Sequence, residues 1–510
     1  MQAENPKLAR SEWYWFAAVI LLGFMIRLFR LSVQSLWLDE MTSIQVAQRS
    51  LPEILSGWAF NNHTPPLYYV LLNLWSKIIP LTEAGLRLPS VLIDLLNMVL
   101  LLRLCLRFTP RINAFFILSA YAVSPFMIYY SQEGRMYTLA VFFALAYSLS
   151  LEKLCRATTG LIAGSLLSGI LLALGLYTHY YFLFFACAVV PLALYATRSS
   201  PKHMAAVCCS GLIAAILFLP WIPIVIQLAE SGGQPFRRFH LSVIPYTFFR
   251  FVVGYAVFPI NIDTKLRFME EVTAHAPELI LVFSLLGLLG YYILMHSRGP
   301  ARPLFLSLAW VVSVPILIAL VVSFKTPVLS ERYFIILFPF FLLLLIGGLE
   351  LKRARQMQAV CALVAFLILG DLAYFINPNF GKAQWRSAAE YVSTIADGDV
   401  IFVEPDYAAD VFKYYFNRPD DVFRLSPLKS QEDVQLDEHF EKAVRNHREI
   451  ILVTSGPFFD KGYSRVLRRI AIEKAPKVFP LETGITCVKW EINRDQLSKS
   501  AVGAFARSPL

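Results

Sequence analysis

The amino-acid sequence predicts an α-helical polytopic membrane protein of about 11 spans, followed by a small soluble α/β domain at the C-terminus. Three observations support this fold class. Of the 510 residues 57% are hydrophobic and 16% are charged, whereas a soluble domain carries about 25% charged residues. Apolar runs such as 13–31 and 357–376 are each long enough to cross a bilayer. After residue 377 the composition becomes that of a soluble domain.

The distribution of Lys and Arg orients the predicted helices, because cytoplasmic loops collect basic residues. Lys7 and Arg10 precede the first apolar run, which places the N-terminus inside. The later basic clusters fall on the same side only if 32–85 is one long outer loop, whose helix 65–79 lies at the interface. The predicted spans are 13–31, 86–106, 112–130, 136–151, 160–178, 180–197, 204–226, 277–296, 303–323, 332–349 and 357–376.

An odd number of spans places the C-terminal region outside, together with the loops 32–85, 131–135, 227–276 and 324–331. Within 227–276, the stretch 241–259 is rich in Phe, Tyr and Val but interrupted by proline and glycine. This composition predicts an amphipathic segment at the interface.

The domain organisation predicted from these patterns is a transmembrane domain at 1–376, an extracytoplasmic α/β domain at 377–493 and a disordered tail at 494–510. The α/β domain is expected to contain strands at 399–403, 449–454 and 484–492, and helices at 385–395, 407–416, 438–446 and 463–474. No Gly-rich phosphate loop opens any of its predicted helices, which favours a lid or scaffold.

The net charge of +10 does not indicate nucleic-acid binding, because the basic residues lie in short loops where membrane topology requires them. The seven cysteines include no CxxC pair and no Cys/His cluster with metal spacing. The composition therefore gives no sign of a zinc site or of a nucleic-acid partner.

The acidic pair Asp39-Glu40 is the strongest candidate for catalysis, because it follows the apolar anchor 36–38 just outside the first span. A carboxylate there can take the proton from an acceptor hydroxyl. Two solvated acids in an ordinary loop are the plainer interpretation of the pair.

Further polar groups gather at the outer helix ends and supply the cations, imidazoles and aromatic rings that sugar transfer from a lipid phosphate needs. These candidate substrate-binding residues are His63, Tyr68, Tyr69, Arg135, His179, Tyr180, Lys325 and Arg332, with Glu133 as a candidate metal ligand.

Each of these residues also has a structural interpretation. Glu133 and Arg135 could form a local loop pair, His179 could belong to an interfacial aromatic belt, and Arg332 could pair with Glu331. Inside the second span, Asp94 and Asn97 are expected to hydrogen-bond to a neighbouring helix rather than to react. Arg27 and Arg30 could either extend to the membrane surface or meet a carrier phosphate.

The order of four motifs resembles the membrane glycosyltransferases of the GT-C fold: Leu36-Trp-Leu-Asp-Glu40, His63-Thr-Pro-Pro-Leu-Tyr-Tyr69, Arg87-Leu-Pro-Ser90 and Tyr130-Ser-Gln-Glu-Gly-Arg-Met-Tyr137. More closely, the sequence is similar to the branch with protein O-mannosyltransferases, aminoarabinose transferases of lipid A and rhizobial galacturonosyltransferases. The later segments at 330–333 and 385–386 also resemble bacterial members of this branch, and the resemblance covers roughly residues 10–400.

The resemblance implies a sugar donor linked to undecaprenyl or dolichyl phosphate, and inverting transfer in one displacement with Asp39 as the base and Glu40 beside it. It implies that Glu133 lies near the site or near a divalent cation, on which family members differ. The C-terminal region lacks a β-trefoil signature, which favours a bacterial enzyme of the inner (plasma) membrane acting on lipid, polysaccharide or another envelope glycan.

Three alternatives remain at this point. A transporter or flippase of lipid-linked sugars would place polar residues on broken helices at mid-membrane and show a repeat between its halves. An O-antigen ligase or polymerase would rely on a late loop with Arg and His. A membrane-anchored scaffold presenting 377–510 would not need Asp39.

Overall fold

The computed structural model describes residues 9–56, 64–230, 243–254, 280, 287, 302–326, 328–349, 353–376, 382–404, 408–424, 449–455, 477–480 and 485–491. The chain folds as two compact units. One comprises 1–31 and 43–380, and the other comprises 32–42 and 381–510. The first is termed the membrane unit and the second the C-terminal unit.

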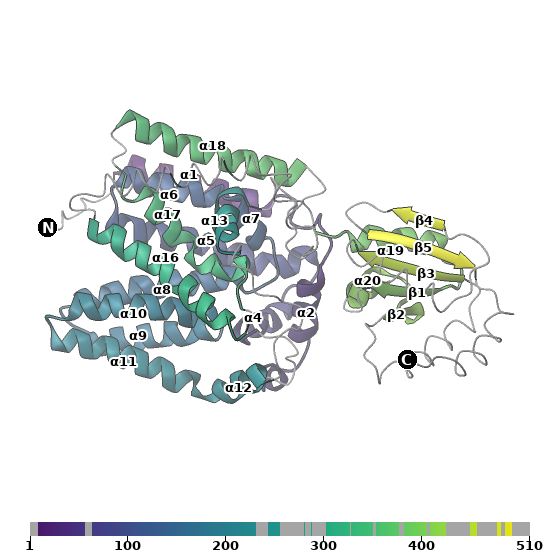
Figure 1. Cartoon of the computed structure of the whole chain (residues 1–510), viewed down its shortest axis with the longest axis horizontal. Coiled ribbons are helices and arrows are strands. Elements are labelled where there is room, and N and C mark those ends of the chain that lie inside the picture. Colours follow the sequence, from purple (N-terminus) through teal and green to yellow (C-terminus); the bar gives the residue numbers. More distant parts are fainter. Residues whose placement is uncertain are drawn as a thin grey trace. The chain divides into compact units, whose positions relative to one another are not determined.

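The membrane unit is built from α-helices (Figure 1). Its first half contains α1 Arg10–Leu28, the part of α2 Leu38–Ala47 from Ser43 onward, α3 Leu51–Leu55, α4 Leu67–Ser76, α5 Glu83–Phe108, α6 Arg111–Ala122, α7 Pro125–Ser131 and α8 Tyr137–Arg156. Its second half contains α9 Leu161–Leu176, α10 Tyr181–Thr197, α11 Pro201–Phe218, η1 Leu219–Trp221, α12 Ile222–Glu230, α13 Val243–Val253, α16 Arg302–Ser323, η2 Glu331–Leu337, α17 Phe338–Ile346 and α18 Ala354–Ile376. Helices α8, α9, α10 and α11 lie side by side.

Within the described residues, five helical stretches are long and apolar enough to cross a membrane. They are Arg10–Leu28, Tyr137–Arg156, Pro201–Gln227, Arg302–Ser323 and Ala354–Ile376. The bent pair α6 and α7 makes a sixth candidate, and α9 and α10 are shorter apolar helices. The predicted polytopic helical fold is thereby confirmed, while the predicted span 277–296 lies outside the described residues apart from 280 and 287.

The predicted span 112–130 is not one straight helix. It divides into α6 and α7, whose axes differ by 54°. The break follows from the sequence Ser124-Pro125: Ser124 is the N-cap of α7 and its Oγ accepts from Met127 N at 3.3 Å, while Pro125 occupies the first turn, where no N–H is needed. The break turns the chain toward residues 131–136.

The predicted interfacial helix at 65–79 is observed as α4, which has 10 residues and a length of about 15 Å, half the thickness of the hydrocarbon core. Of the segment predicted to graze the membrane at 241–259, the structure describes 243–254; Val243–Val253 form α13, with most of its side chains buried against α7, α18 and η2. Gly254 ends α13 with φ 67°, and a Cβ there would lie 2.7 Å from Pro125 Cβ. Close packing on α7 therefore replaces the expected exposure to the interface.

The C-terminal unit contains a five-stranded sheet of order β2-β1-β3-β5-β4. Its strands are β1 Val400–Glu404, β2 Val422–Arg424, β3 Glu449–Ser455, β4 Lys477–Pro480 and β5 Ile485–Glu491, and its helices are α19 Trp385–Ile395 and α20 Ala409–Tyr415. Strands β2, β1 and β3 are parallel, while β5 is antiparallel to β3 and to β4. This small sheet confirms the predicted α/β layer, with two strands that the sequence analysis missed. The predicted helices 438–446 and 463–474 lie outside the described residues.

Candidate functional site

The turn at 132–136, between α7 and α8, carries two buried charged side chains. Glu133 is 1% exposed and Arg135 is 5% exposed. Arg135 N donates to Glu133 O at 2.8 Å, which closes the turn. A Cβ at Gly134 would lie 2.4 Å from Leu86 Cγ on α5, so only glycine allows this approach. The motif Glu-Gly-Arg thus folds tightly because its glycine lets the turn pack on α5.

The guanidinium of Arg135 is held by hydroxyl groups from segments far apart in the sequence. Its Nη1 donates to Tyr69 Oη at 3.0 Å and to Ser43 Oγ at 3.4 Å, and its Nη2 donates to Thr64 Oγ1 at 3.4 Å. The structure therefore brings α2, the start of α4 and the turn at 132–136 together around one cation.

Helix α4 contacts the same turn through Tyr68. The hydroxyl groups of Tyr68 and Ser90 share a hydrogen bond of 2.8 Å, and Ser90 Oγ also donates to Arg135 O at 3.3 Å. Tyr68 and Tyr69 are each 1% exposed. Of the two tyrosines predicted to bind substrate, Tyr69 thus contacts the side chain of Arg135 directly, and Tyr68 is linked to its main chain through Ser90.

His179 lies in the loop between α9 and α10 and is a buried, neutral imidazole. Its Nδ1 accepts from Tyr181 N at 3.1 Å, which leaves the proton on Nε2. Burial, together with the nearby charges of Arg135 and Arg332, lowers its pKa to about 3. The ring packs against Tyr181 and Tyr333, at centroid distances of 5.4 and 5.1 Å. At neutral pH His179 therefore offers an N–H donor in the neighbourhood of two guanidinium groups.

Tyr180 belongs to the same cluster. Its hydroxyl accepts from Trp221 Nε1 at 3.1 Å. The loop that carries Tyr180 is joined to α4 by the hydrogen bond from Leu67 N to Tyr177 O, 3.0 Å long. Tyr180 thus belongs to a loop that is bonded to the helix carrying Tyr69.

Arg332 lies at the start of η2, half-buried, with its guanidinium 5.3 Å from the centroid of the Tyr333 ring. Two of the predicted site residues are not brought into this cluster by the described contacts. Lys325 follows α16 with an exposed side chain, and His63 lies outside the described residues. We term Tyr68, Tyr69, Arg135, His179, Tyr180 and Arg332 the cationic cluster.

The acidic motif lies in the C-terminal unit, at the first turn of α2. Asp39 is half-buried, and the helix N-terminus stabilises a carboxylate at this position. Glu40 is fully buried, and its Oε1 lies 3.3 Å from Lys382 Nζ, which is itself 5.6 Å from the centroid of the Trp37 ring. Glu40 is thus neutralised by a buried ammonium group.

The segment preceding Asp39 is fixed by hydrogen bonds within the C-terminal unit. Leu36 N donates to Tyr415 Oη at 2.8 Å, Trp385 N donates to Ser35 Oγ at 3.1 Å, and Ser35 Oγ donates to Ala383 O at 2.7 Å. The backbone that presents Asp39 is therefore held from residues near 383 and 415.

Comparison with known proteins assigns this architecture. Residues 63–224 match the model of the dolichyl-phosphate-mannose-protein mannosyltransferase family. ArnT from Cupriavidus metallidurans in the apo state superposes with a TM-score of 0.59 at 11% identity, over 94% of this chain and 98% of that chain. The same protein bound to undecaprenyl phosphate gives 0.56 at 12% identity over the same shares of both chains.

This chain has the GT-C fold. The resemblance to membrane glycosyltransferases inferred from the sequence motifs is confirmed, and the family model and the fold support a glycosyltransferase. The Archaeoglobus fulgidus oligosaccharyltransferase in the apo form matches with a TM-score of 0.48 at 13% identity, over 88% of this chain and 70% of that chain. No curated protein matches the sequence.

Among the residues that the sequence analysis missed, the structure places Lys382 against the acidic motif. Lys382, the partner of Glu40, lies three residues before Trp385, in a segment where only Trp385 and Arg386 had attracted attention. No motif surrounds Lys382 in the sequence, so only the fold reveals its pairing with Glu40. The catalytic and binding roles of the other candidates stay predictions.

Proposed function

We propose that this protein is an inverting glycosyltransferase that moves a sugar from a polyprenyl-phosphate donor to an envelope acceptor, which is a lipid, a glycan or a protein. One observation carries the proposal: the buried guanidinium of Arg135 is held by three hydroxyl groups, and the ring of His179 packs 5.1 Å from that of Tyr333, the residue after Arg332. Both arginines lie close enough to His179 to lower its pKa. Two guanidinium groups and an N–H donor in one cluster suit a phosphate group. The undecaprenyl phosphate bound by ArnT, which shares this fold, supports the same class of donor.

In the proposed reaction, Asp39 takes the proton from an acceptor hydroxyl, and the oxygen attacks the anomeric carbon of the donor. The bond from that carbon to the phosphate oxygen breaks, and the carrier leaves as polyprenyl phosphate with the bonding electrons. The arginines stabilise the negative charge that the phosphate gains. Asp39 is preferred to Glu40 as the base because Glu40 is buried in an ion pair with Lys382.

A divalent cation at Glu133 has less support. In the ranges that the structure describes, no group of three or more His, Cys, Asp or Glu side chains could hold a metal ion. The proposed reaction therefore uses Asp39 and the arginines only. Full turnover in EDTA is the result expected from a metal-independent transfer, and loss that Mg²⁺ or Mn²⁺ restores would assign a metal role to Glu133.

We also propose that the protein resides in the inner (plasma) membrane, with the site and the C-terminal unit on the extracytoplasmic face. The basic loops of the sequence support this orientation, since they fall on the side opposite residues 32–85. Accessibility of single cysteines at Lys7 and Lys413 to a membrane-impermeant maleimide in intact cells tests it. Labelling of Lys7→Cys would contradict this orientation. Labelling of Lys413→Cys but not of Lys7→Cys would agree with it.

The function is tested with the full-length protein in nanodiscs, incubated with polyprenyl-phosphate sugars and an envelope lipid extract. Mass spectrometry follows donor loss and product gain. Release of polyprenyl phosphate with a product heavier by one sugar supports the transferase. The alternative, a flippase of lipid-linked sugars, predicts intact donor that changes leaflet in sealed vesicles, and that result would overturn the proposal.

A further inference from the structure

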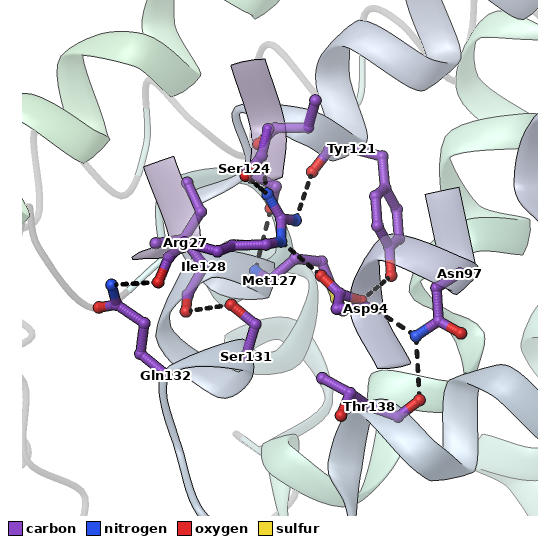
Figure 2. A network of polar contacts seen from close by, with 12 residues as sticks. Arg27, Asp94, Asn97, Tyr121, Ser124, Met127, Ile128, Ser131, Gln132 and Thr138 are labelled. Atoms are coloured by element: carbon purple, nitrogen blue, oxygen red, sulfur yellow. Dashed lines mark hydrogen bonds and ion pairs between the residues drawn. The ribbon is translucent and has the colours of Figure 1, made fainter. Parts of the chain in front are cut away.

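A network of buried polar contacts lies behind the turn at 132–136 (Figure 2). Arg27 on α1 and Asp94 on α5 form an ion pair with an Nε–Oδ2 distance of 2.6 Å, and both side chains are fully buried. Tyr121 Oη donates to Asp94 Oδ1 at 2.6 Å, and Asn97 Nδ2 donates to the same oxygen at 3.0 Å. Each charge is therefore compensated, as a charge inside a helical membrane protein must be.

The network caps two helices that end close to each other. Arg27 donates to Ala122 O at 2.8 Å and to Tyr121 O at 3.3 Å, which are the last carbonyls of α6 at the break. Gln132 Nε2 in turn donates to Arg27 O at 2.9 Å and Phe29 O at 2.8 Å, at the end of α1. Carbonyls at helix ends lack partners within their own helix, so these side chains satisfy them.

The same network reaches the far side of the turn. Asn97 Nδ2 also donates to Thr138 O at 2.9 Å, in the first turn of α8. Gln132 immediately precedes Glu133, and Thr138 follows Arg135 by three residues. The turn that carries both charged residues is thus attached to the end of α1 on one side and to α5 on the other.

We propose that Gln132 and Asn97 are positioning residues, which fix the turn at 132–136 so that Arg135 keeps its place in the cationic cluster. The kinetic part of this inference rests on the proposed function. The structural part does not, because it concerns only how firmly the turn is held.

The chain offers a matched control at Asn113 on α6. Asn113 is 1% exposed, and its Nδ2 donates to Ile346 O at 2.7 Å and Leu349 O at 2.9 Å, at the end of α17. Its side-chain amide donates two hydrogen bonds to helix-end carbonyls, as the amide of Gln132 does. Among the described residues, Asn113 makes no hydrogen bond to the turn at 132–136. Replacing either amide by leucine removes the same kind of interaction.

The experiment compares Gln132→Leu, Asn97→Leu and Asn113→Leu in the full-length protein in nanodiscs. We expect Gln132→Leu and Asn97→Leu to lower turnover about 10- to 100-fold, because a displacement of about 1 Å at a site costs that much. The loss should appear mainly in kcat, since the phosphate gains its charge only as the bond breaks. Asn113→Leu should lower Tm about as much as Gln132→Leu does, but it should change turnover less than about twofold.

Hydrogen exchange of residues 133–139 provides a readout that needs no turnover. Faster exchange there in Gln132→Leu and Asn97→Leu, but not in Asn113→Leu, is the expected result. Unchanged exchange, or an equal loss of turnover in all three variants, would overturn the inference. If the wild-type protein transfers no sugar, the proposed function fails and the exchange data still decide the positioning role. If Gln132→Leu does not fold, Asn97→Leu decides alone.

Discussion

The acidic motif and the cationic cluster lie in different compact units, and their charged groups differ in burial and in partners. In the C-terminal unit, Glu40 is fully buried against Lys382, and Asp39 remains half-buried beside it. In the membrane unit, Arg135 and Arg332 both act on His179, which burial keeps neutral. The carboxylate of Glu40 is paired with a lysine, while that of Asp39 is more exposed. The two arginines, by contrast, influence the same neutral imidazole.

The comparison separates two roles within one proposed reaction. A base must meet an acceptor hydroxyl, which suits the more exposed of two adjacent acids. A group that binds phosphate must stay charged and be backed by firm contacts, which Arg135 has through Tyr69, Ser43 and Thr64. The predictions below test whether the roles divide in this way.

The largest expected effect on stability concerns Lys382. Lys382→Met leaves the buried carboxylate of Glu40 without its ammonium partner, which we expect to destabilise the C-terminal unit by about 3–5 kcal/mol. Urea unfolding of the full-length protein in detergent, followed by Trp fluorescence, measures the change. The double variant Glu40→Gln/Lys382→Met should recover part of the loss. No recovery would show that Glu40 and Lys382 act separately, and the contrast between Glu40 and Asp39 would disappear.

A smaller effect is expected on donor binding. Arg135→Gln removes a charged donor, and a hydrogen bond to a charged group is worth about 1.5–3 kcal/mol, so the Kd for a polyprenyl-phosphate sugar should rise about 10- to 100-fold. Native mass spectrometry in nanodiscs measures it. Arg198→Gln is the matched control, because Arg198 is exposed and rests on the ring of Tyr195. Equal donor affinity in both variants would show that Arg135 does not bind the phosphate.

The smallest expected effect is the pH dependence that His179 contributes. Burial lowers its pKa from 6.5 to about 3, so the unfolded chain binds a proton that the folded protein does not. The stability from this group is complete above pH 6.5 and is lost as the pH falls toward 3. Between pH 7.5 and 5.5 the loss should be about 1 kcal/mol.

Replacement of His179 tests that slope. His179→Gln should flatten the fall in unfolding free energy between the two pH values, whereas His203→Gln should not. His203 is half-buried and bonded to Ser200 and Ala157, so it controls for loss of an imidazole. Identical slopes in wild type and His179→Gln would mean that His179 is not the buried neutral ring described above.

The sequence predicted the helical membrane fold well, because long apolar runs are unambiguous over 20 residues. It predicted less where local chemistry interrupts such a run. The span 112–130 breaks at Ser124-Pro125, a capping signal that hydropathy alone conceals. Similarly, the apolar stretch around α13 could not show that it packs on α7 rather than on lipid.

The candidate site was predictable in its residue types but not in its pairings. Asp94 and Asn97 were expected to bond to a neighbouring helix, and the contacts with Arg27 and Thr138 confirm this. Nothing in the sequence named Arg27 as the partner. The pairing of Glu40 with Lys382 is likewise a property of the fold, because the two residues lie far apart in the sequence.

The central claim, that Asp39 is the base of a sugar transfer, is tested most directly by comparing wild type with Asp39→Asn in matched nanodiscs. Turnover and donor affinity are measured on the same preparations. The account predicts that Asp39→Asn binds donor as wild type does and loses about 10²- to 10⁴-fold in rate, as expected when a general base is removed. Turnover of Asp39→Asn at the wild-type rate would contradict it.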